Sequence, residues 1–300
     1  MLAERIERVL IDVVGSARHE QGPALLAEAI HHSVFPGGAR IRPQLALAVS
    51  VACGDADPDL SERFSAALEL MHCASLVHDD LPCFDDAATR RGRPSVHAAF
   101  GERLAVLAGD SLIVLAFRCV IRSRVREALR LQQALSMLEF AVAPPFGIAA
   151  GQAWECEPRA RLSEYQRSKT GALFAAATEG GAICGGGDGP AWRLLGESLG
   201  EAYQVADDIR DVVLDQRQLG KPANQDILLD RPSAARQFGL EGAYAYFDAL
   251  MTRALSAIPP CAGEARLRNM VLAESERLLP LSVRSAGLQP AAGPLSIGLN

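Results

Sequence analysis

Apolar residues recur every three or four positions along most of the chain, as at Leu45, Val49 and Ala52 and again at Leu68 and Met71. This spacing keeps their side chains on one face of an α-helix. We find no run of alternating apolar and polar residues bounded by a tight-turn pair, which would indicate a β-hairpin. The pattern predicts an all-α fold. The expected helices span residues 2–16, 22–33, 39–53, 59–82, 95–99, 102–121, 123–155, 162–184, 190–216, 222–229, 232–236, 239–256 and 262–280.

The segments between these helices are short and rich in glycine and proline, for example residues 36–38 and 185–187. Short connections are typical of helix bundles. No linker separates two compositionally different halves, although 300 residues could also form two domains. We therefore predict one domain over residues 1–300, in which residues 281–300 lose the helical pattern and form a loosely packed tail.

Composition excludes several classes of protein. Hydrophobic residues make up 49% and charged residues 22% of the chain, which is typical of a globular protein. The net charge of −6 does not favour a nucleic-acid partner. Seven scattered cysteines without a Cys-x-x-Cys pair indicate neither a disulfide framework nor a zinc site, so we expect a cytoplasmic protein. Because Asp110 and the pair Pro144 and Pro145 interrupt the longest apolar stretches, we expect no transmembrane segment.

Two aspartate clusters are the main chemical signal. In the second cluster, Asp207 and Asp211 are four residues apart, so a helix places both carboxylates on one face. In the first cluster, Asp79 and Asp85 are six apart, and Pro82 between them can end the helix and let the chain curl back. One such cluster alone is more often a solvated helix face. Two clusters made of oxygen ligands, without cysteine or histidine in a zinc pattern, favour Mg²⁺ shared with a substrate diphosphate.

Basic residues accompany both clusters. Arg90 and Arg91 follow the first cluster, and Lys221 follows the second. Lys169 and Lys221 are the only two lysines among 30 basic residues, and both lie where a phosphate ligand is expected. Arginine binds phosphate oxygens in a bidentate manner, whereas lysine supplies a mobile point charge.

These residues resemble the trans-isoprenyl diphosphate synthases over about residues 30–235. Residues 71–85 followed by 90–94 are similar to the first aspartate-rich motif of that family, and residues 203–211 with 219–226 are similar to the second. Residues 107–110, 150–152 and 169–172 support the match. Residues 37–43 and 150–155 are closest to geranylgeranyl diphosphate synthases of purple-bacterial carotenoid and bacteriochlorophyll pathways.

The resemblance implies an all-α bundle around a central cavity, of the isoprenoid synthase type, forming a homodimer. It implies a prenyltransferase that condenses isopentenyl diphosphate with an allylic diphosphate, using three Mg²⁺ ions. The implied metal ligands are Asp79, Asp80, Asp85, Asp207, Asp208 and Asp211. The allylic diphosphate would contact Arg90, Lys169, Thr170, Gln204 and Lys221, and isopentenyl diphosphate would contact Arg42, His72 and Arg91. The predicted catalytic residues are Asp79, Asp85, Lys169, Asp207 and Lys221.

One position departs from the family pattern. Ala39 stands where many relatives carry a lysine, which removes one cation from the expected isopentenyl diphosphate site. We expect Arg40 and Arg42 to remain there as cations.

Product length should depend on the residues one turn before the first aspartate. Ala74 and Ser75 are small, and relatives that stop at fifteen carbons tend to carry a bulky aromatic there. We therefore expect a twenty-carbon product, geranylgeranyl diphosphate, with Met71 or Leu68 at the floor of the cavity. A farnesyl diphosphate synthase is the first alternative. A terpene cyclase or a non-catalytic partner subunit is less favoured, because the second aspartate cluster is intact.

Overall fold

The computed structural model describes residues 2–35, 37–158, 164–165, 167–214, 233–280 and 283. The helices are α1 (Leu2–Gly15), α2 (Ala24–Val34), α3 (Ile41–Ala52), α4 (Pro58–Asp79), α5 (Val96–Phe100), α6 (Glu102–Ile121), α7 (Ala128–Val142), α8 (Ile148–Ala153), α10 (Ala172–Gly185), α11 (Arg193–Val213), α14 (Ala234–Ser256) and α15 (Glu264–Leu278). Three short helical turns complete them, η1 (Trp154–Cys156), η2 (Arg167–Gly171) and η3 (Gly189–Trp192). The all-α prediction is confirmed.

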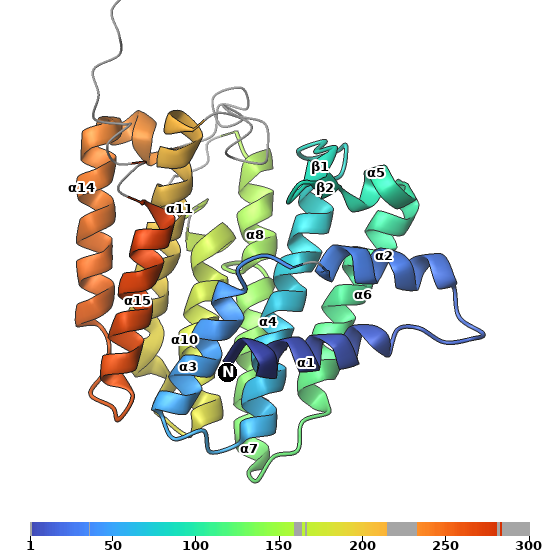
Figure 1. The fold of residues 1–300 in the computed structure, drawn as a ribbon, viewed down its shortest axis with the longest axis horizontal. Coiled ribbons are helices and arrows are strands. Elements are labelled where there is room, and N and C mark those ends of the chain that lie inside the picture. Colours follow the sequence, from blue (N-terminus) through green and yellow to red (C-terminus); the bar gives the residue numbers. More distant parts are fainter. Residues whose placement is uncertain are drawn as a thin grey trace, which may run out of the picture.

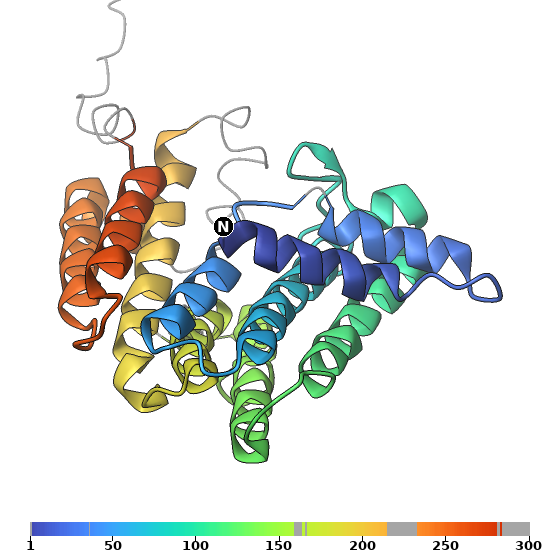
Figure 2. The same cartoon turned by 60° about the horizontal axis from the view of Figure 1, so that its bottom comes forward.

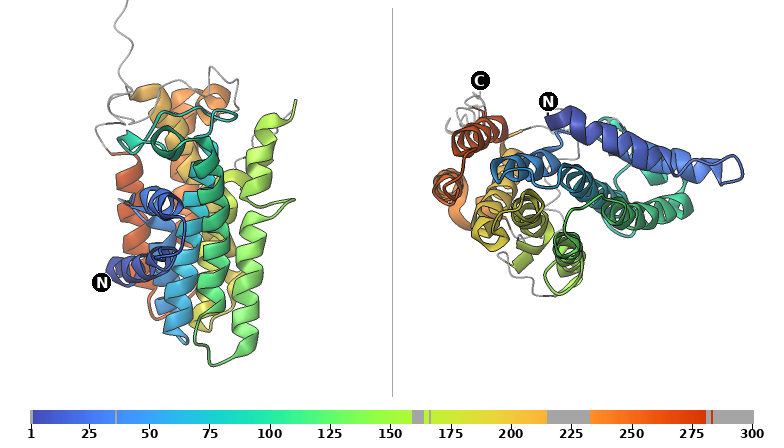
Figure 3. Two further views of the ribbon diagram at one scale, coloured as in Figure 1. Left: turned by 90° about the vertical axis from the view of Figure 1, so that its right-hand side faces the viewer. Right: turned by 90° about the horizontal axis from the view of Figure 1, so that it is seen from below.

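The long helices stand side by side, and α1 and α2 cross them (Figure 1). Viewed from below, α3, α4, α10 and α11 lie inside the bundle, with α14 and α15 on one side and α6 and α7 on another (Figure 3). Figure 2 shows α1 and α2 running one after the other across one side of the bundle, over α4 and α6. One continuous apolar core runs from Ile6 in α1 to Leu278 in α15.

Small residues allow the inner helices to pack closely. α10 is rich in alanine and glycine, and it lies against α3, α4, α7 and α11. A side chain at Gly181 would collide with the backbone carbonyl of Ala46 in α3. The close approach of these backbones keeps the walls of the bundle rigid around the residues described below.

Two predicted helices end earlier than expected because of proline. The helix expected over 59–82 ends at Asp79, since the residue before Pro82 is disfavoured in the α conformation. The single helix expected over 123–155 is wrong. Pro144 and Pro145 divide it into α7 and α8, because a proline inside a helix removes a hydrogen bond and clashes with the preceding turn.

A small β-hairpin is present where no strand was expected. β1 (Thr89–Arg90) pairs antiparallel with β2 (Arg93–Pro94). Its two turn residues, Arg91 and Gly92, both have positive φ angles of 54° and 75°. Such angles are typical of a tight hairpin turn, and the hairpin lies beside the end of α4 (Figure 1).

The break expected between 232–236 and 239–256 is confirmed, since α14 is interrupted at Gly239, whose φ is 70° and ψ is 170°. The helix expected over 222–229 and most of the tail expected over 281–300 lie outside the described residues.

α6 is the one helix, within the described ranges, that is long and apolar enough to cross a membrane. An 18-residue window has a mean hydropathy of 2.1, so the expectation that Asp110 interrupts this stretch was wrong. Within the fold, 44% of that window is buried, and α6 packs along α4 and against α2. One face of α6 therefore packs in the core, and the opposite face leaves apolar side chains exposed.

Candidate active site

A cleft of about 210 Å³ lies at the C-terminal end of α4, the upper end in Figure 1. Side chains from α3, α4, the hairpin segment, α8, η2 and α11 line it. Ten residues predicted from the sequence meet there: Arg42, His72, Ser75, Asp79, Asp85, Arg90, Lys169, Thr170, Gln204 and Asp207.

Three carboxylates gather on one wall of the cleft. Asp79, Asp85 and Glu155 each offer an oxygen, and the three oxygens lie within 4.8 Å of one another. Asp85 reaches this position because the chain curls back after α4, and its backbone N–H donates to the carbonyl of Asp79 at 2.9 Å. The curl predicted from Pro82 is therefore present. Hard oxygen ligands at this spacing suit a divalent cation such as Mg²⁺.

Sequence reasoning did not assign a role to Gln152, Glu155 or Tyr165. The Gln152 amide donates a hydrogen bond to Asp79 Oδ1, and the Tyr165 hydroxyl donates to Glu155 Oε1 at 2.8 Å. The sequence signal for Gln152 was the family match at residues 150–152. In the structure, any side chain at Gly151 would collide with the backbone of Lys169. The glycine thus allows α8 to touch η2.

η2 carries Lys169 and Thr170 into the cleft. It is a single π-helical turn, a rare conformation that often occurs at functional sites. The Lys169 ammonium donates to Glu155 and lies 3.6 Å from Asp79 Oδ1. Thr170 Oγ1 donates to Gln204 Oε1 at 3.0 Å, which connects η2 to α11.

Arg42 and His72 form the cationic side of the cleft. The Arg42 guanidinium carbon lies 4.7 Å from the centre of the Phe174 ring, and its Nε has no hydrogen-bond partner among the described residues. Burial lowers the pKa of Arg42. Burial, together with the nearby Arg42 charge, holds the pKa of His72 well below its ordinary value, so this imidazole is neutral. A half-buried cation that has no carboxylate partner among the described residues is a natural binding group for a diphosphate.

The three aspartates of the second cluster have different surroundings. Asp207 lines the cleft, and its carboxylate is 3.8 Å from Arg210. Asp208 is buried and accepts hydrogen bonds from Gln204 Nε2 at 3.0 Å and from the backbone N–H of Ala234 at 2.6 Å. Asp211 is also buried, one turn beyond Asp207. Asp207 is thus the member that faces the first cluster across the cleft, while Asp208 fixes Gln204.

Asp80 and Arg91 lie behind the cleft. Asp80 is buried, and its Oδ1 accepts a hydrogen bond from Arg90 Nε at 2.9 Å. Arg91 packs against Gly38, where any side chain would meet its guanidinium. Both residues line a neighbouring crevice of about 40 Å³, which Arg90 shares with the main cleft.

Arg40 does not contribute a cation to the cleft, which corrects the expectation above. Its guanidinium is buried and bonds to Glu7 Oε1 at 2.9 Å, to Glu69 Oε1 at 2.6 Å and to the carbonyl of Val34 at 2.8 Å. The carboxylates of Glu7 and Glu69 balance the charge of the Arg40 guanidinium. Since Ala39 is exposed, Arg42 is the cation that the segment 37–43 supplies to the cleft.

The three residues predicted to set product length lie in different surroundings. Ser75 lines the cleft, whereas Ala74 and Met71 are each 2% exposed and belong to the packed core. Lys221, the remaining predicted residue, lies outside the described part of the chain.

An aspartate-rich cleft at one end of a helical bundle, with arginine and lysine beside it, defines a class of metal-dependent diphosphate enzymes. A sequence model described as polyprenyl synthetase matches residues 23–257, and the chain belongs to that family.

The chain is similar to two curated relatives over most of its length. It is 49% identical to the geranylgeranyl diphosphate synthase of Cereibacter sphaeroides and 44% identical to that of Rhodobacter capsulatus, each over 93% of this chain and 97% of the relative. Among solved structures it resembles a geranyltransferase from Helicobacter pylori complexed with magnesium and isoprenyl diphosphate. That similarity has a TM-score of 0.80 at 28% identity and covers 92% of this chain and 96% of the other.

Proposed function

We propose that this chain is a geranylgeranyl diphosphate synthase. It would condense isopentenyl diphosphate head-to-tail with an allylic diphosphate to give the twenty-carbon product. The observation that carries the proposal is that nine residues predicted to bind metal and diphosphate line one cleft. The 49% identity to a synthase of that name, over 93% of the chain, supports the same product.

The donor set suits magnesium. We propose Asp79 and Asp85 on one wall and Asp207 on the other as ligands of three Mg²⁺ ions, with Asp80, Asp208 and Asp211 in support. Glu155 joins this set because its oxygen lies within 4.8 Å of those of Asp79 and Asp85. When bound, the ions supply neutralising charge to the departing diphosphate.

Side chains of the cleft, together with Arg91 behind it and Lys221 outside the described residues, would bind the two diphosphates. Arg90, Lys169, Thr170, Gln204 and Lys221 would hold the allylic diphosphate, and Arg42, His72 and Arg91 would hold isopentenyl diphosphate. Their charges and hydrogen bonds are directed at a group that becomes more negative as the allylic C–O bond breaks, which lowers the barrier. The reaction needs no protein nucleophile, and the released diphosphate is our proposed base for the final proton.

The purified protein tests the proposal directly. It is incubated with Mg²⁺, isopentenyl diphosphate and either dimethylallyl or farnesyl diphosphate, and the products are separated by chromatography. We expect geranylgeranyl diphosphate. A product that stops at fifteen carbons indicates farnesyl diphosphate synthase, a cyclised hydrocarbon indicates a cyclase, and activity only with a second protein indicates a partner subunit.

We further propose a homodimer formed through α6 and α7. Leu107, Val114 and Ile121 are spaced seven residues apart on α6 and are 50%, 66% and 58% exposed. An open groove beside them, lined by Phe117, Ile121 and residues of α7, extends the apolar face. A second copy would remove this surface from water. We expect Val114→Asp to convert a dimer to a monomer in sedimentation experiments, and a wild-type monomer would contradict the proposal.

A cytoplasmic location stays a proposal from composition. It is supported by the seven cysteines, all of which are described and free of disulfide bonds.

A further inference from the structure

The C-terminal helix α15 reaches the second aspartate-bearing helix through one tyrosine. The Tyr203 hydroxyl in α11 donates to Glu274 Oε2 in α15 at 2.7 Å. Arg277 Nη2 donates to the Tyr203 hydroxyl at 2.7 Å, and Arg277 Nε donates to Glu274 Oε2 at 2.8 Å. The hydroxyl is therefore fixed by two partners, which lie beyond the segment 23–257 that the family model matches.

The ring of Tyr203 leads from this contact toward the cleft. Its centre lies 4.6 Å from the centre of the Phe174 ring in α10, at an interplanar angle of 41°. Phe174 is fully buried, and the guanidinium carbon of Arg42 lies over its ring, 4.7 Å from the ring centre. α15, Tyr203, Phe174 and Arg42 thus form one continuous series of contacts from the outside of the bundle to the cleft.

Arg42 depends on this ring for its position. No carboxylate pairs with it among the described residues, and its Nε has no hydrogen-bond partner. A guanidinium over an aromatic face gains more when both are shielded from water, and Phe174 is fully shielded. Arg40, two residues earlier, shows the contrasting case, in which carboxylates fix the guanidinium. Movement of the Phe174 ring is therefore transmitted to Arg42.

We propose that Tyr203, Glu274 and Arg277 are positioning residues for the isopentenyl diphosphate side of the cleft. They hold Phe174, and through it Arg42, at the place where the diphosphate binds. The proposal rests on the proposed function, since it takes Arg42 as the ligand of isopentenyl diphosphate. On the allylic diphosphate side, Thr170 bonds to Gln204 and Lys169 pairs with Glu155, so these side chains are positioned by contacts other than those of Tyr203, Phe174 and Arg42.

Tyr203→Phe tests this, because it removes the hydroxyl and keeps the ring. The full-length variant is titrated with isopentenyl diphosphate alone by calorimetry, and KM for each substrate is measured with Mg²⁺. We expect Kd and KM for isopentenyl diphosphate to rise about three- to tenfold, while KM for the allylic substrate stays at the wild-type value. Unchanged values, or an equal rise for both substrates, would overturn the proposal.

Tyr246→Phe is a matched control. The Tyr246 hydroxyl in α14 donates to Glu201 in α11, so the variant removes the same kind of bond from the same helix. It does not touch Phe174, and we expect both KM values to stay unchanged. An equal rise of Kd in both variants would show a general loss of packing and contradict a positioning role.

Two further variants test the same proposal independently. If Tyr203→Phe does not fold, Arg277→Gln retains the bond between Tyr203 and Glu274 and should show a smaller rise of the same kind. In an Arg42→Lys background, Tyr203→Phe should raise Kd no further, because the two residues act in series. Additive effects would overturn the proposal.

Failure of the positioning role is distinguishable from failure of the proposed function. A wild-type protein that binds isopentenyl diphosphate but forms no product contradicts only the function, and the Kd comparison still decides the positioning role. A wild-type protein that binds no isopentenyl diphosphate overturns both.

Discussion

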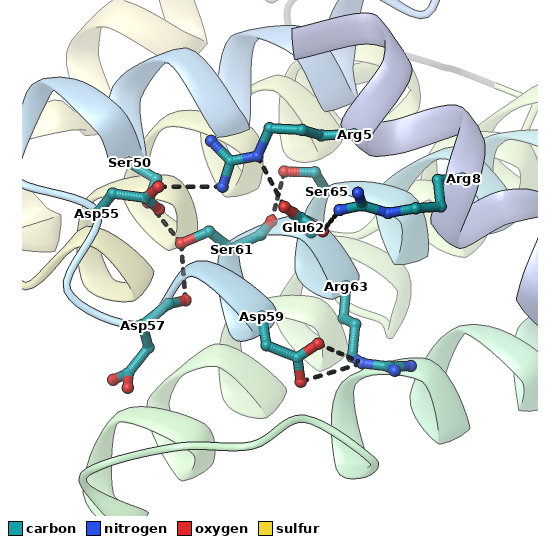
Figure 4. A network of polar contacts seen from close by, with 10 residues as sticks. All are labelled: Arg5, Arg8, Ser50, Asp55, Asp57, Asp59, Ser61, Glu62, Arg63 and Ser65. Carbon is teal, nitrogen blue, oxygen red and sulfur yellow. Dashed lines mark hydrogen bonds and ion pairs between the residues drawn. The ribbon is translucent and has the colours of Figure 1, made fainter. Parts of the chain in front are cut away.

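Acidic residues gather at both ends of α4, and the two groups serve opposite purposes. At the N-terminal end, Glu62 pairs with Arg5 and Arg8 of α1, and serine hydroxyls join the network (Figure 4). Asp57, in the same network, pairs with Arg130 of α7. At the C-terminal end, Asp79 and Glu155 share one ammonium group, that of Lys169.

The difference shows how one helix both stabilises the fold and prepares a site. Matched opposite charges satisfy each other and stabilise helix packing. Three carboxylate oxygens within 4.8 Å repel one another, and a divalent cation between them would relieve that repulsion. Stability and reactivity are thus separated along a single helix of 22 residues.

The strongest test of this separation is Asp79→Asn. It removes a charge from the crowded end while keeping the side-chain shape. We expect kcat/KM for condensation to fall about a thousandfold. The free energy of unfolding should stay the same or increase, because repulsion is relieved. Product formation and chemical denaturation are measured on the same preparation, and a large loss of stability would contradict the comparison.

Asp57→Asn is the matched change at the other end. Asp57 is buried, pairs with Arg130 and accepts a hydrogen bond from the backbone N–H of Arg126 at 2.9 Å. Breaking the buried pair leaves Arg130 with only the exposed Glu127 carboxylate at 3.3 Å, so we expect a loss of about 3–5 kcal/mol in the free energy of unfolding. Turnover measured well below the unfolding temperature should match the wild type, and a selective fall in kcat would show that the two ends are coupled.

Ser75→Phe tests how far the reactive end extends along α4. Ser75 lines the cleft one turn before Asp79, so an aromatic ring there should shorten the space for the growing chain. We expect the ratio of twenty- to fifteen-carbon product to fall about tenfold, a change that needs only about 1.4 kcal/mol. Ala74→Phe is the control. Because Ala74 lies in the packed core, this change should lower stability by about 1–3 kcal/mol through overpacking. An unchanged product profile in Ser75→Phe would exclude it as a length determinant.

His72 predicts a pH dependence of stability at the reactive end. Its pKa in the folded protein lies below the ordinary value of 6.5, because of burial and the charges of Arg42, Arg91, Arg90 and Arg40. As the pH falls below about 6.5, the unfolded chain takes up a proton first, so stability is lost. The slope contributed by one proton is at most about 1.4 kcal/mol per pH unit. His72→Gln should reduce the slope of unfolding free energy against pH between pH 6.5 and 5. Above neutral pH, the slope should be the same as in the wild type. Identical slopes would refute this account.

The smallest effect belongs to Arg63, which pairs with Asp59 one helical turn away at the N-terminal end. Both side chains are partly exposed, so Arg63→Ala should cost only about 0.3–0.5 kcal/mol, less at high salt. Comparison with Asp57→Asn in denaturation experiments then separates exposed pairs from buried ones. Equal losses would mean that burial does not set their strength.

The sequence predicted the periodic parts of the molecule well. Helices such as α6 and α11 follow directly from their apolar spacing, and the curl at Asp85 follows from Pro82. The division at Pro144 and Pro145 was missed because the helical pattern continues on both sides of it.

The site was predictable where a chemical type recurs at a fixed spacing, as with Asp79, Asp85 and Asp207. Glu155 and Gln152 could not be found in this way, because their contacts depend on how closely α8 approaches η2. The role of Arg40 was assigned wrongly for a similar reason. Its neighbour Arg42 looks the same in the sequence, and only the carboxylates of Glu7 and Glu69 distinguish them.

The single π turn at η2 has a further consequence. A π turn holds one residue more than the α-helical turn it replaces. Deleting one residue within Arg167–Gly171 would allow ordinary winding to resume and would turn the preceding side chains by about 100° around the axis of α10. The register of one short turn thus decides whether the lysine amine meets the carboxylates or points elsewhere.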